Sequence, residues 1–204
     1  GAPPILITSK SGNDYLLAGQ KSGMVFALDP SNEGRILWRK KIGRGGHNGG
    51  IHWGMAADEN VLYVPIADVG EHAFATGEPR PGVHALDIAT GEILWSHLEG
   101  NTCSQDSFEC FAGFSAPITL SSEILFAGGL NGVFHAYLSA TGTKLWQFNT
   151  LKEFSAVNQM TGKGGTIDGS GPVIAGNMLY LNSGYGRYGK LGGNVLLAFS
   201  ISKD

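Results

Sequence analysis

The two cysteines are the first residues in this sequence whose type and spacing suggest chemistry. Cys103 and Cys110 are its only cysteines, and they lie close together in a chain of 204 residues that contains 32 glycines. A pair this close in a glycine-rich chain predicts a short disulfide loop, which is typical of an oxidising compartment. Two unrelated buried thiols are the alternative. We therefore expect a periplasmic or secreted protein.

The ionisable residues do not form a metal-binding or nucleophilic pattern. Asp68 ends an apolar run and could bind a cation, but a calcium site needs about six or more oxygen ligands. The sequence has no phosphate-binding loop, nucleotide fingerprint or Ser-His-Asp arrangement. Five histidines lack the spacing of metal ligands, and we interpret them as structural or exposed: His47, His72, His84, His97 and His135. No metal site is predicted in this chain.

Composition excludes two further classes of function. The net charge is −3, and charged residues make up 15% of the chain, so there is no basic stripe of the kind that nucleic acid requires. Residues 39–41 and Arg44 form a local basic run, which we interpret as a solvated outer strand. No apolar stretch approaches the roughly 20 residues of a membrane-spanning helix.

An internal repeat is the strongest signal in the sequence. Residues 23–38, 82–95 and 132–146 share one pattern: an apolar run, then a turn glycine, then a tryptophan four residues after that glycine. A fourth copy begins at residues 193–199 and stops before its turn. The three tryptophans are Trp38, Trp95 and Trp146. We expect each to pack over the turn of its own blade, with no chemical role.

Two further strand-like runs precede each copy, which gives four short strands in about 50 residues, as in a β-propeller blade. We expect the inner strands of the later blades at residues 52–57, 115–120 and 171–175. The predicted fold is all-β, with propeller blades of four antiparallel strands, in one partial domain spanning residues 1–204. It contains three full blades and an incomplete fourth, at approximately residues 1–43, 50–100, 113–150 and 165–204.

The repeat resembles that of a known family. Its form at residues 85–95, Ala-Leu-Asp-x-Ala-Thr-Gly-x-x-Leu-Trp, is similar to the repeat of pyrroloquinoline-quinone (PQQ) propellers. This repeat occurs in quinoprotein alcohol dehydrogenases. It also occurs in propellers that are not enzymes, such as the lipoprotein that assists outer-membrane protein assembly. The repeat therefore implies the fold but leaves the function open.

Two segments carry a more specific resemblance to the dehydrogenases. Residues 19–23 resemble the segment whose lysine or arginine contacts the quinone oxygens, which implies this role for Lys21. Residues 49–56 resemble an inner strand whose Asn-Trp pair faces the cofactor, and here His52 replaces the asparagine before Trp53. Alternation along a strand would send these two side chains to opposite faces.

Two later segments extend the resemblance. Residues 113–117, with Phe114, and residues 165–169, with Asp168, stand where later blades begin their inner strands. Asp168 is also followed by glycine, which by itself signals a turn. Together with residues 182–186, these segments most closely resemble the polyvinyl-alcohol-dehydrogenase-like branch. The cofactor-binding candidates are Lys21, His52, Trp53, Phe114 and Asp168.

The resemblance implies the C-terminal half of an eight-bladed ring that oxidises an alcohol and transfers hydride to PQQ. It places no catalytic residue in this chain: the catalytic aspartate is expected just upstream of Gly1, and the calcium ligands in earlier blades. A c-type cytochrome is the expected electron acceptor. An N-terminal strand would complete the last blade. The alternatives are a non-enzymatic propeller that serves as a binding or assembly scaffold, and a quinone-free propeller that retains only the motifs.

Overall fold

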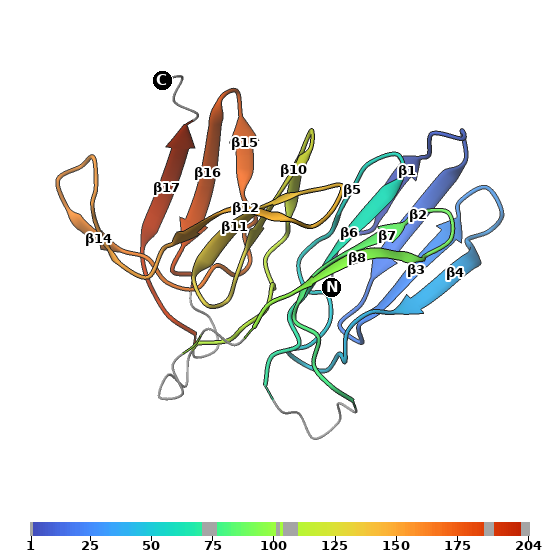
Figure 1. Cartoon of the computed structure of the whole chain (residues 1–204), viewed down its shortest axis with the longest axis horizontal. Helices are drawn as coiled ribbons and strands as arrows, with labels where there is room; N and C mark the ends of the chain where they lie inside the picture. Colours follow the sequence, from blue (N-terminus) through green and yellow to red (C-terminus); the bar gives the residue numbers. More distant parts are fainter. Residues whose placement is uncertain (1, 71–76, 101–102, 104–109, 186–189, 201–204) are drawn as a thin grey trace.

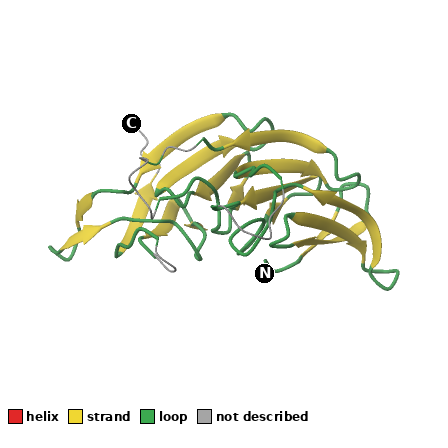
Figure 2. Cartoon of the chain, turned by 90° about the horizontal axis from the view of Figure 1, so that it is seen from below, coloured by secondary structure: helices red, strands yellow, loops and turns green. Residues whose placement is uncertain are grey.

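The computed structural model describes residues 2–70, 77–100, 103, 110–185 and 190–200. All regular structure in these residues is β, in strands β1 to β17 (Figure 2). The described residues form five sheets, and the four larger ones follow one another in chain order, from β1–β4 at one end to β15–β17 at the other (Figure 1). Within the described ranges, no helix is long and apolar enough to cross a membrane.

Three of the sheets are four-stranded antiparallel blades in which the strands follow chain order, as predicted. The first contains β1 (Ile5–Thr8), β2 (Asp14–Gly19), β3 (Met24–Asp29) and β4 (Arg35–Lys41). The second contains β5 (Ala56–Ala57), β6 (Val61–Ile66), β7 (Gly82–Asp87) and β8 (Ile93–Leu98). The third contains β9 (Thr119–Ser121), β10 (Ile124–Gly128), β11 (Val133–Leu138) and β12 (Lys144–Asn149).

The fourth sheet has three strands, β15 (Val173–Ala175), β16 (Met178–Ser183) and β17 (Val195–Ser200), so the prediction of an incomplete fourth blade is confirmed. A separate hairpin precedes it, formed by β13 (Glu153–Ser155) and β14 (Thr161–Lys163). The sequence did not predict this hairpin. Its Phe154 ring stacks at 6.3 Å on Phe148 of β12.

The core lies between neighbouring sheets, because a blade can bury a face only against the next blade. Leu17 and Val25 of the first blade pack with Leu62 of the second. Alternation along each strand sends every second residue into these interfaces, which is why β2 has the burial pattern exposed, buried, intermediate, buried. The other two interfaces are centred on Tyr63 and Phe134.

The repeat tryptophans connect blades, so the prediction that each packs over the turn of its own blade is wrong. The indole Nε1 of Trp38 on β4 donates to the carbonyl of Ile88 in the second blade, at 2.8 Å. Trp95 on β8 does the same to Ser139 in the third blade, at 2.8 Å. Side chains stand perpendicular to their own sheet, so the indole points toward the adjacent blade.

The inner strands are shorter than predicted. Of the expected residues 52–57, only Ala56 and Ala57 form a strand, and His52 and Trp53 lie in the connection that precedes β5. Residues 115–118 are likewise outside β9. Strand alternation therefore does not govern how His52 and Trp53 point. The glycines and prolines around these segments favour an extended path without a partner strand.

Candidate functional site

Loops from all four sheets meet around one small cavity of about 100 Å³. The connections that contribute are β2–β3, β4–β5, β8–β9, β14–β15 and β16–β17. Loop residues on a rigid scaffold are the usual carriers of function. The lining residues are Lys21, Asn48, His52, Trp53, Ser115, Asp168 and Lys190. Four of the five predicted cofactor-binding residues are thus brought together.

Lys21 lies in the turn between β2 and β3, where its backbone is packed against the β4–β5 connection. Its Nζ donates to the carbonyl of His47 at 3.2 Å. Gly50 allows this close approach: its φ is +66°, and a Cβ there would lie 2.4 Å from the Lys21 carbonyl oxygen. Only glycine tolerates both the left-handed conformation and the contact, so Gly50 holds Lys21 beside the His52 segment.

Asp68 also fixes the β4–β5 connection, through hydrogen bonds from backbone N–H groups. Its buried carboxylate accepts the backbone N–H groups of Gly45 and Gly50 through Oδ1, at 3.0 and 2.8 Å. Its Oδ2 accepts those of Arg44 and Arg80, at 2.7 and 2.9 Å. Burial alone would raise the pKa of Asp68, but these four donors hold it below its ordinary value. Asp68 is therefore a structural anion that positions the loop, a role that its place at the end of a strand did not reveal.

His52 is buried, and both of its ring nitrogens have partners. Nδ1 lies 2.7 Å from the hydroxyl of Ser115, and Nε2 lies 3.0 Å from the carbonyl of Gly49. Burial, with a further contribution from the positive charge of Lys21, lowers the pKa of His52 to about 4. The ring is therefore neutral at pH 7. Since a carbonyl only accepts, Nε2 carries the proton and Nδ1 accepts from Ser115.

Asp168 joins Trp53 to Lys190. Its Oδ1 accepts the indole Nε1–H of Trp53 at 3.1 Å, and its Oδ2 accepts from Nζ of Lys190 at 2.6 Å. Burial acts to raise the pKa of Asp168, but hydrogen bonds from Lys190, Ser115 and Trp53 and the lysine charge bring it below its ordinary value. The aspartate is thus ionised, and it holds both side chains at the cavity. Trp53 remains 48% exposed, so its ring is accessible to a ligand.

Phe114 lies elsewhere. Its ring is fully buried in the interface between the second and third blades, edge-on to His135 at a centroid distance of 5.6 Å. The structure also adds residues that sequence reasoning missed: Asn48, Ser115 and Lys190. Ser115 directly follows Phe114 in a segment that had been singled out. Lys190 had no signal beyond a glycine-rich surrounding sequence.

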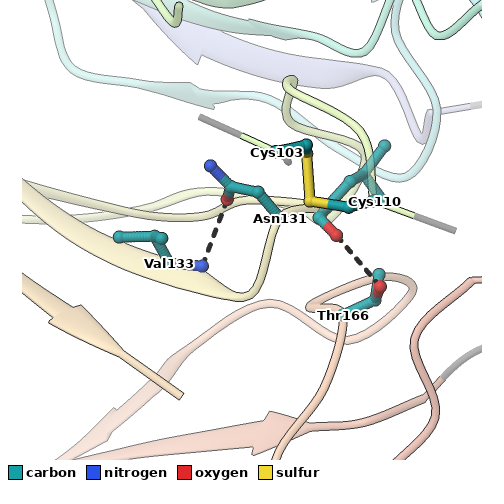
Figure 3. The surroundings of a disulfide bond; sticks show 6 residues. Cys103, Cys110, Asn131, Val133 and Thr166 are labelled. Atoms are coloured by element: carbon teal, nitrogen blue, oxygen red, sulfur yellow. Dashed lines mark hydrogen bonds between the residues drawn. A yellow bond between two sulfur atoms is a disulfide. The ribbon is translucent and has the colours of Figure 1, made fainter. Parts of the chain in front are cut away.

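The predicted disulfide is confirmed: Cys103 and Cys110 are bonded, with a sulfur–sulfur distance of 2.06 Å (Figure 3). The bond borders a second cavity, of about 470 Å³, which also contacts the turn that carries Asn131. His135 and Glu99 line this cavity too. Within the described part of the chain, no group of three His, Cys, Asp or Glu side chains is arranged to hold a metal ion.

Blades that dock through an outer-strand tryptophan, with a polar cavity where their loops meet, define a repeat propeller. Two overlapping segments, residues 21–97 and 79–203, match the PQQ_2 family model, whose description is outer membrane protein assembly factor BamB. The matches cover most of the chain, which therefore belongs to this family.

The chain is also similar to individual proteins over nearly its whole length. The chain is 39% identical over 213 aligned residues to a polyvinylalcohol dehydrogenase of Sphingopyxis sp. (strain 113P3), a match that covers 98% of this chain and 32% of the relative. A second protein of that name, from Pseudomonas sp., is 38% identical over 211 residues with the same coverage. The chain thus spans about a third of the length of these relatives.

Solved structures agree on the fold. BamB from Moraxella catarrhalis superimposes with a TM-score of 0.62 at 19% identity, over 98% of this chain and 49% of that one. The quinohemoprotein alcohol dehydrogenase from Comamonas testosteroni gives a TM-score of 0.60 at 19% identity, over 98% of this chain and 33% of that one. At this identity the likeness shows the propeller fold alone.

Proposed function

We propose that the whole protein is a PQQ-dependent alcohol dehydrogenase and that this chain supplies one side of its quinone site. The observation that carries the proposal is the convergence of Lys21, Trp53 and Asp168 from three separate loops on one cavity. The similarity to two polyvinylalcohol dehydrogenases supports it. We further propose that residues 1–204 form a single partial propeller domain within an eight-bladed ring.

The residues fit an oxygen-rich, anionic quinone. Lys21 and Lys190 offer ammonium donors to its oxygens, and Trp53 offers an exposed aromatic surface. Bound PQQ would accept the hydride from the alcohol, because the cofactor carries the redox chemistry. In the proposal Lys21 stabilises the negative charge that develops on the quinone oxygens, since donors aimed at developing charge are among the largest contributions to catalysis. The cavity of about 100 Å³ would border one edge of the cofactor.

The proposal assigns the remaining machinery to blades beyond this chain. These would supply the catalytic carboxylate that takes the hydroxyl proton, together with the ligands of a calcium ion. A c-type cytochrome would take the electrons, and the disulfide is consistent with a periplasmic or secreted location. Which alcohol is oxidised would depend on residues from those other blades.

A scaffold protein is the second candidate, because the matching family model carries the description of an outer-membrane assembly factor. The two candidates make different demands on Lys21. A quinone site requires a positively charged donor such as Lys21, whose ammonium group borders the cavity and donates to the His47 carbonyl. A scaffold does not require a charged group at this position.

Replacing Lys21 in the whole protein tests the dehydrogenase proposal. Lys21→Ala should lower turnover of an alcohol with PQQ by roughly 100- to 1000-fold, the usual consequence of removing one donor aimed at developing charge. Lys21→Arg should retain more activity, since the positive charge survives. Lys10→Ala, a lysine in the β1–β2 turn away from the cavity, is the control. Dye-linked turnover is the measurement, and parental rates in Lys21→Ala would contradict the proposal.

A further inference from the structure

A cluster of buried polar groups without hydrogen-bond partners lies between the second and third blades. The side chain of Glu99, directly after β8, is 7% exposed, and that of His135 on β11 is 1% exposed. Among the described residues, nothing hydrogen-bonds Oε2 of Glu99 or either ring nitrogen of His135. Buried polar groups in folded proteins almost always have partners. Both side chains line the second cavity, of about 470 Å³, so a ligand there could supply the partners.

The spacing around Oε2 of Glu99 points to an interposed atom. Nε2 of His97 lies 3.8 Å from this oxygen, and Nε2 of His135 and Nζ of Lys144 each lie 4.0 Å from it. These distances are too long for direct hydrogen bonds. They suit an oxygen atom that lies between two of the groups and makes a hydrogen bond of about 2.8 Å to each. A single bridging water would need only about 10–15 Å³, whereas the cavity is many times larger.

The chemistry of the cluster favours a neutral hydroxyl group. Burial, with smaller contributions from Lys144 and His97, lowers the pKa of His135 to about 3, so its neutral ring offers one donor and one acceptor. The carboxyl group of Glu99 accepts from a hydroxyl in either protonation state. A hydroxyl donates and accepts, so it can satisfy both side chains at once. Glu99 and Lys144 have opposite charges, so the cavity favours neither an anion nor a cation.

The rest of the lining suits a ligand with several hydroxyls on a carbon chain. The amides of Gln147 and Asn149 add hydrogen-bonding groups, and Leu151 and Leu191 add apolar surface for C–H groups. Leu191 directly follows Lys190, which lines the cavity proposed for the quinone. Consecutive residues of the β16–β17 connection therefore border the two cavities.

We propose that the second cavity is a binding site for a neutral polyol, with one hydroxyl held between Glu99 and His135. The inference goes beyond the proposed function and requires no quinone. Where the proposed function holds, the site retains a polyhydroxylated substrate next to the quinone cavity.

The test is saturation-transfer NMR on the whole protein without PQQ, with erythritol as the probe. The parent should transfer saturation to erythritol, and the concentration dependence gives a Kd. Glu99→Met and His135→Phe should each raise this Kd roughly tenfold, as expected when a bound hydroxyl loses a buried hydrogen-bond partner. Glu123→Met, at an exposed glutamate in the β9–β10 turn, is the matched control and should leave the Kd unchanged.

A second probe separates hydroxyl recognition from general contact. The ether oxygens of 1,2-dimethoxyethane only accept, so this molecule should show no transfer at the same concentration. Absence of transfer to erythritol in the parent would mean that the cavity binds only water, and would overturn the inference. Equal transfer to the ether, or an unchanged Kd in Glu99→Met and His135→Phe, would also overturn it. None of these outcomes bears on the quinone site, which the Lys21 variants test separately.

Discussion

Individual histidines make this protein sensitive to acid. Burial lowers the pKa of His52 and His84 to about 4 and that of His135 to about 3. The unfolded chain, with histidine pKa values near 6.5, therefore binds more protons than the folded one at mildly acidic pH. Stability should be fully present above about pH 6.5 and decline as the pH falls toward 4, by about 2 kcal/mol per histidine at pH 5.

His84 isolates one of these contributions. In urea unfolding of the whole protein at pH 7.5 and pH 5, His84→Asn should shrink the acid loss by about 2 kcal/mol. Glu99 acts in the opposite direction, because burial raises its pKa and acid relieves its buried charge. Its effect is shared by parent and variant, so the difference between them reports His84. An unchanged acid loss in the variant would show that His84 titrates normally in the folded protein.

At the scale of elements, the contact between the outer strand of one blade and the turn of the next holds the blades in register. Trp38 on β4 lies over Gly91, where an added Cβ would come within 2.7 Å of the indole ring. Gly91 also has a φ of +72°. Both the backbone conformation and the packing therefore exclude a side chain there, which explains why the turn glycine and the tryptophan recur together.

Gly91→Ala separates these two effects when it is compared with Gly12→Ala. Gly12 has a φ of +85° but open space around it, so alanine there incurs only the left-handed strain of about 1–2 kcal/mol. Gly91→Ala should lose a further 1–3 kcal/mol or so through overpacking against Trp38. Thermal unfolding of the two variants is the measurement. Equal losses of stability in the two variants would mean that the Trp38 ring moves at little cost to accommodate the added methyl group, and that the contact between the blades is loosely packed.

At the scale of the whole molecule, the first blade has an apolar face that no other part of the described chain covers. Leu6, Leu16, Leu28 and Ile36 are successive cross-strand neighbours over β1 to β4. They alternate with the residues that face the second blade, and Leu6 is 67% exposed. An apolar row of this kind fits another blade of the same propeller, since stacking is how blades bury their faces.

Expressed alone, these 204 residues should therefore self-associate. Size-exclusion chromatography with light scattering should show oligomers for the parent chain and a shift toward monomer for Leu16→Lys. Val157→Lys, at a fully exposed apolar residue outside this row, should leave association unchanged. A monodisperse parent chain that melts cooperatively would contradict the prediction.

Gly34 provides the corresponding test in the whole protein. It is the turn glycine of the first repeat, with a φ of +72° and nothing within 4 Å of a built Cβ. If another blade docks on the first through its own tryptophan, Gly34→Ala should destabilise the whole protein as much as Gly91→Ala does. A loss of stability no larger than that of Gly12→Ala would indicate that no blade docks on this face.

The sequence by itself determined the blades. Turn glycines stand at a fixed distance before Trp38, Trp95 and Trp146 because each repeat needs a left-handed turn followed by an alternating strand. These requirements are local, so they can be recognised from the sequence alone. The disulfide between Cys103 and Cys110 could be predicted for the same reason, because the two residues are close in the sequence. Resemblance then singled out Lys21, His52, Trp53 and Asp168, which the structure brings to one cavity.

Only the tertiary structure decided which blade each tryptophan contacts and which residues complete the site. Trp38 reaches Ile88 and Asp168 reaches Lys190 across separate elements, and periodicity carries no information about such pairings. The length of β5 was overestimated because strand formation depends on a partner strand as well as on side chains. The contact between His52 and Ser115, 63 positions apart in the sequence, likewise arises only when the chain folds.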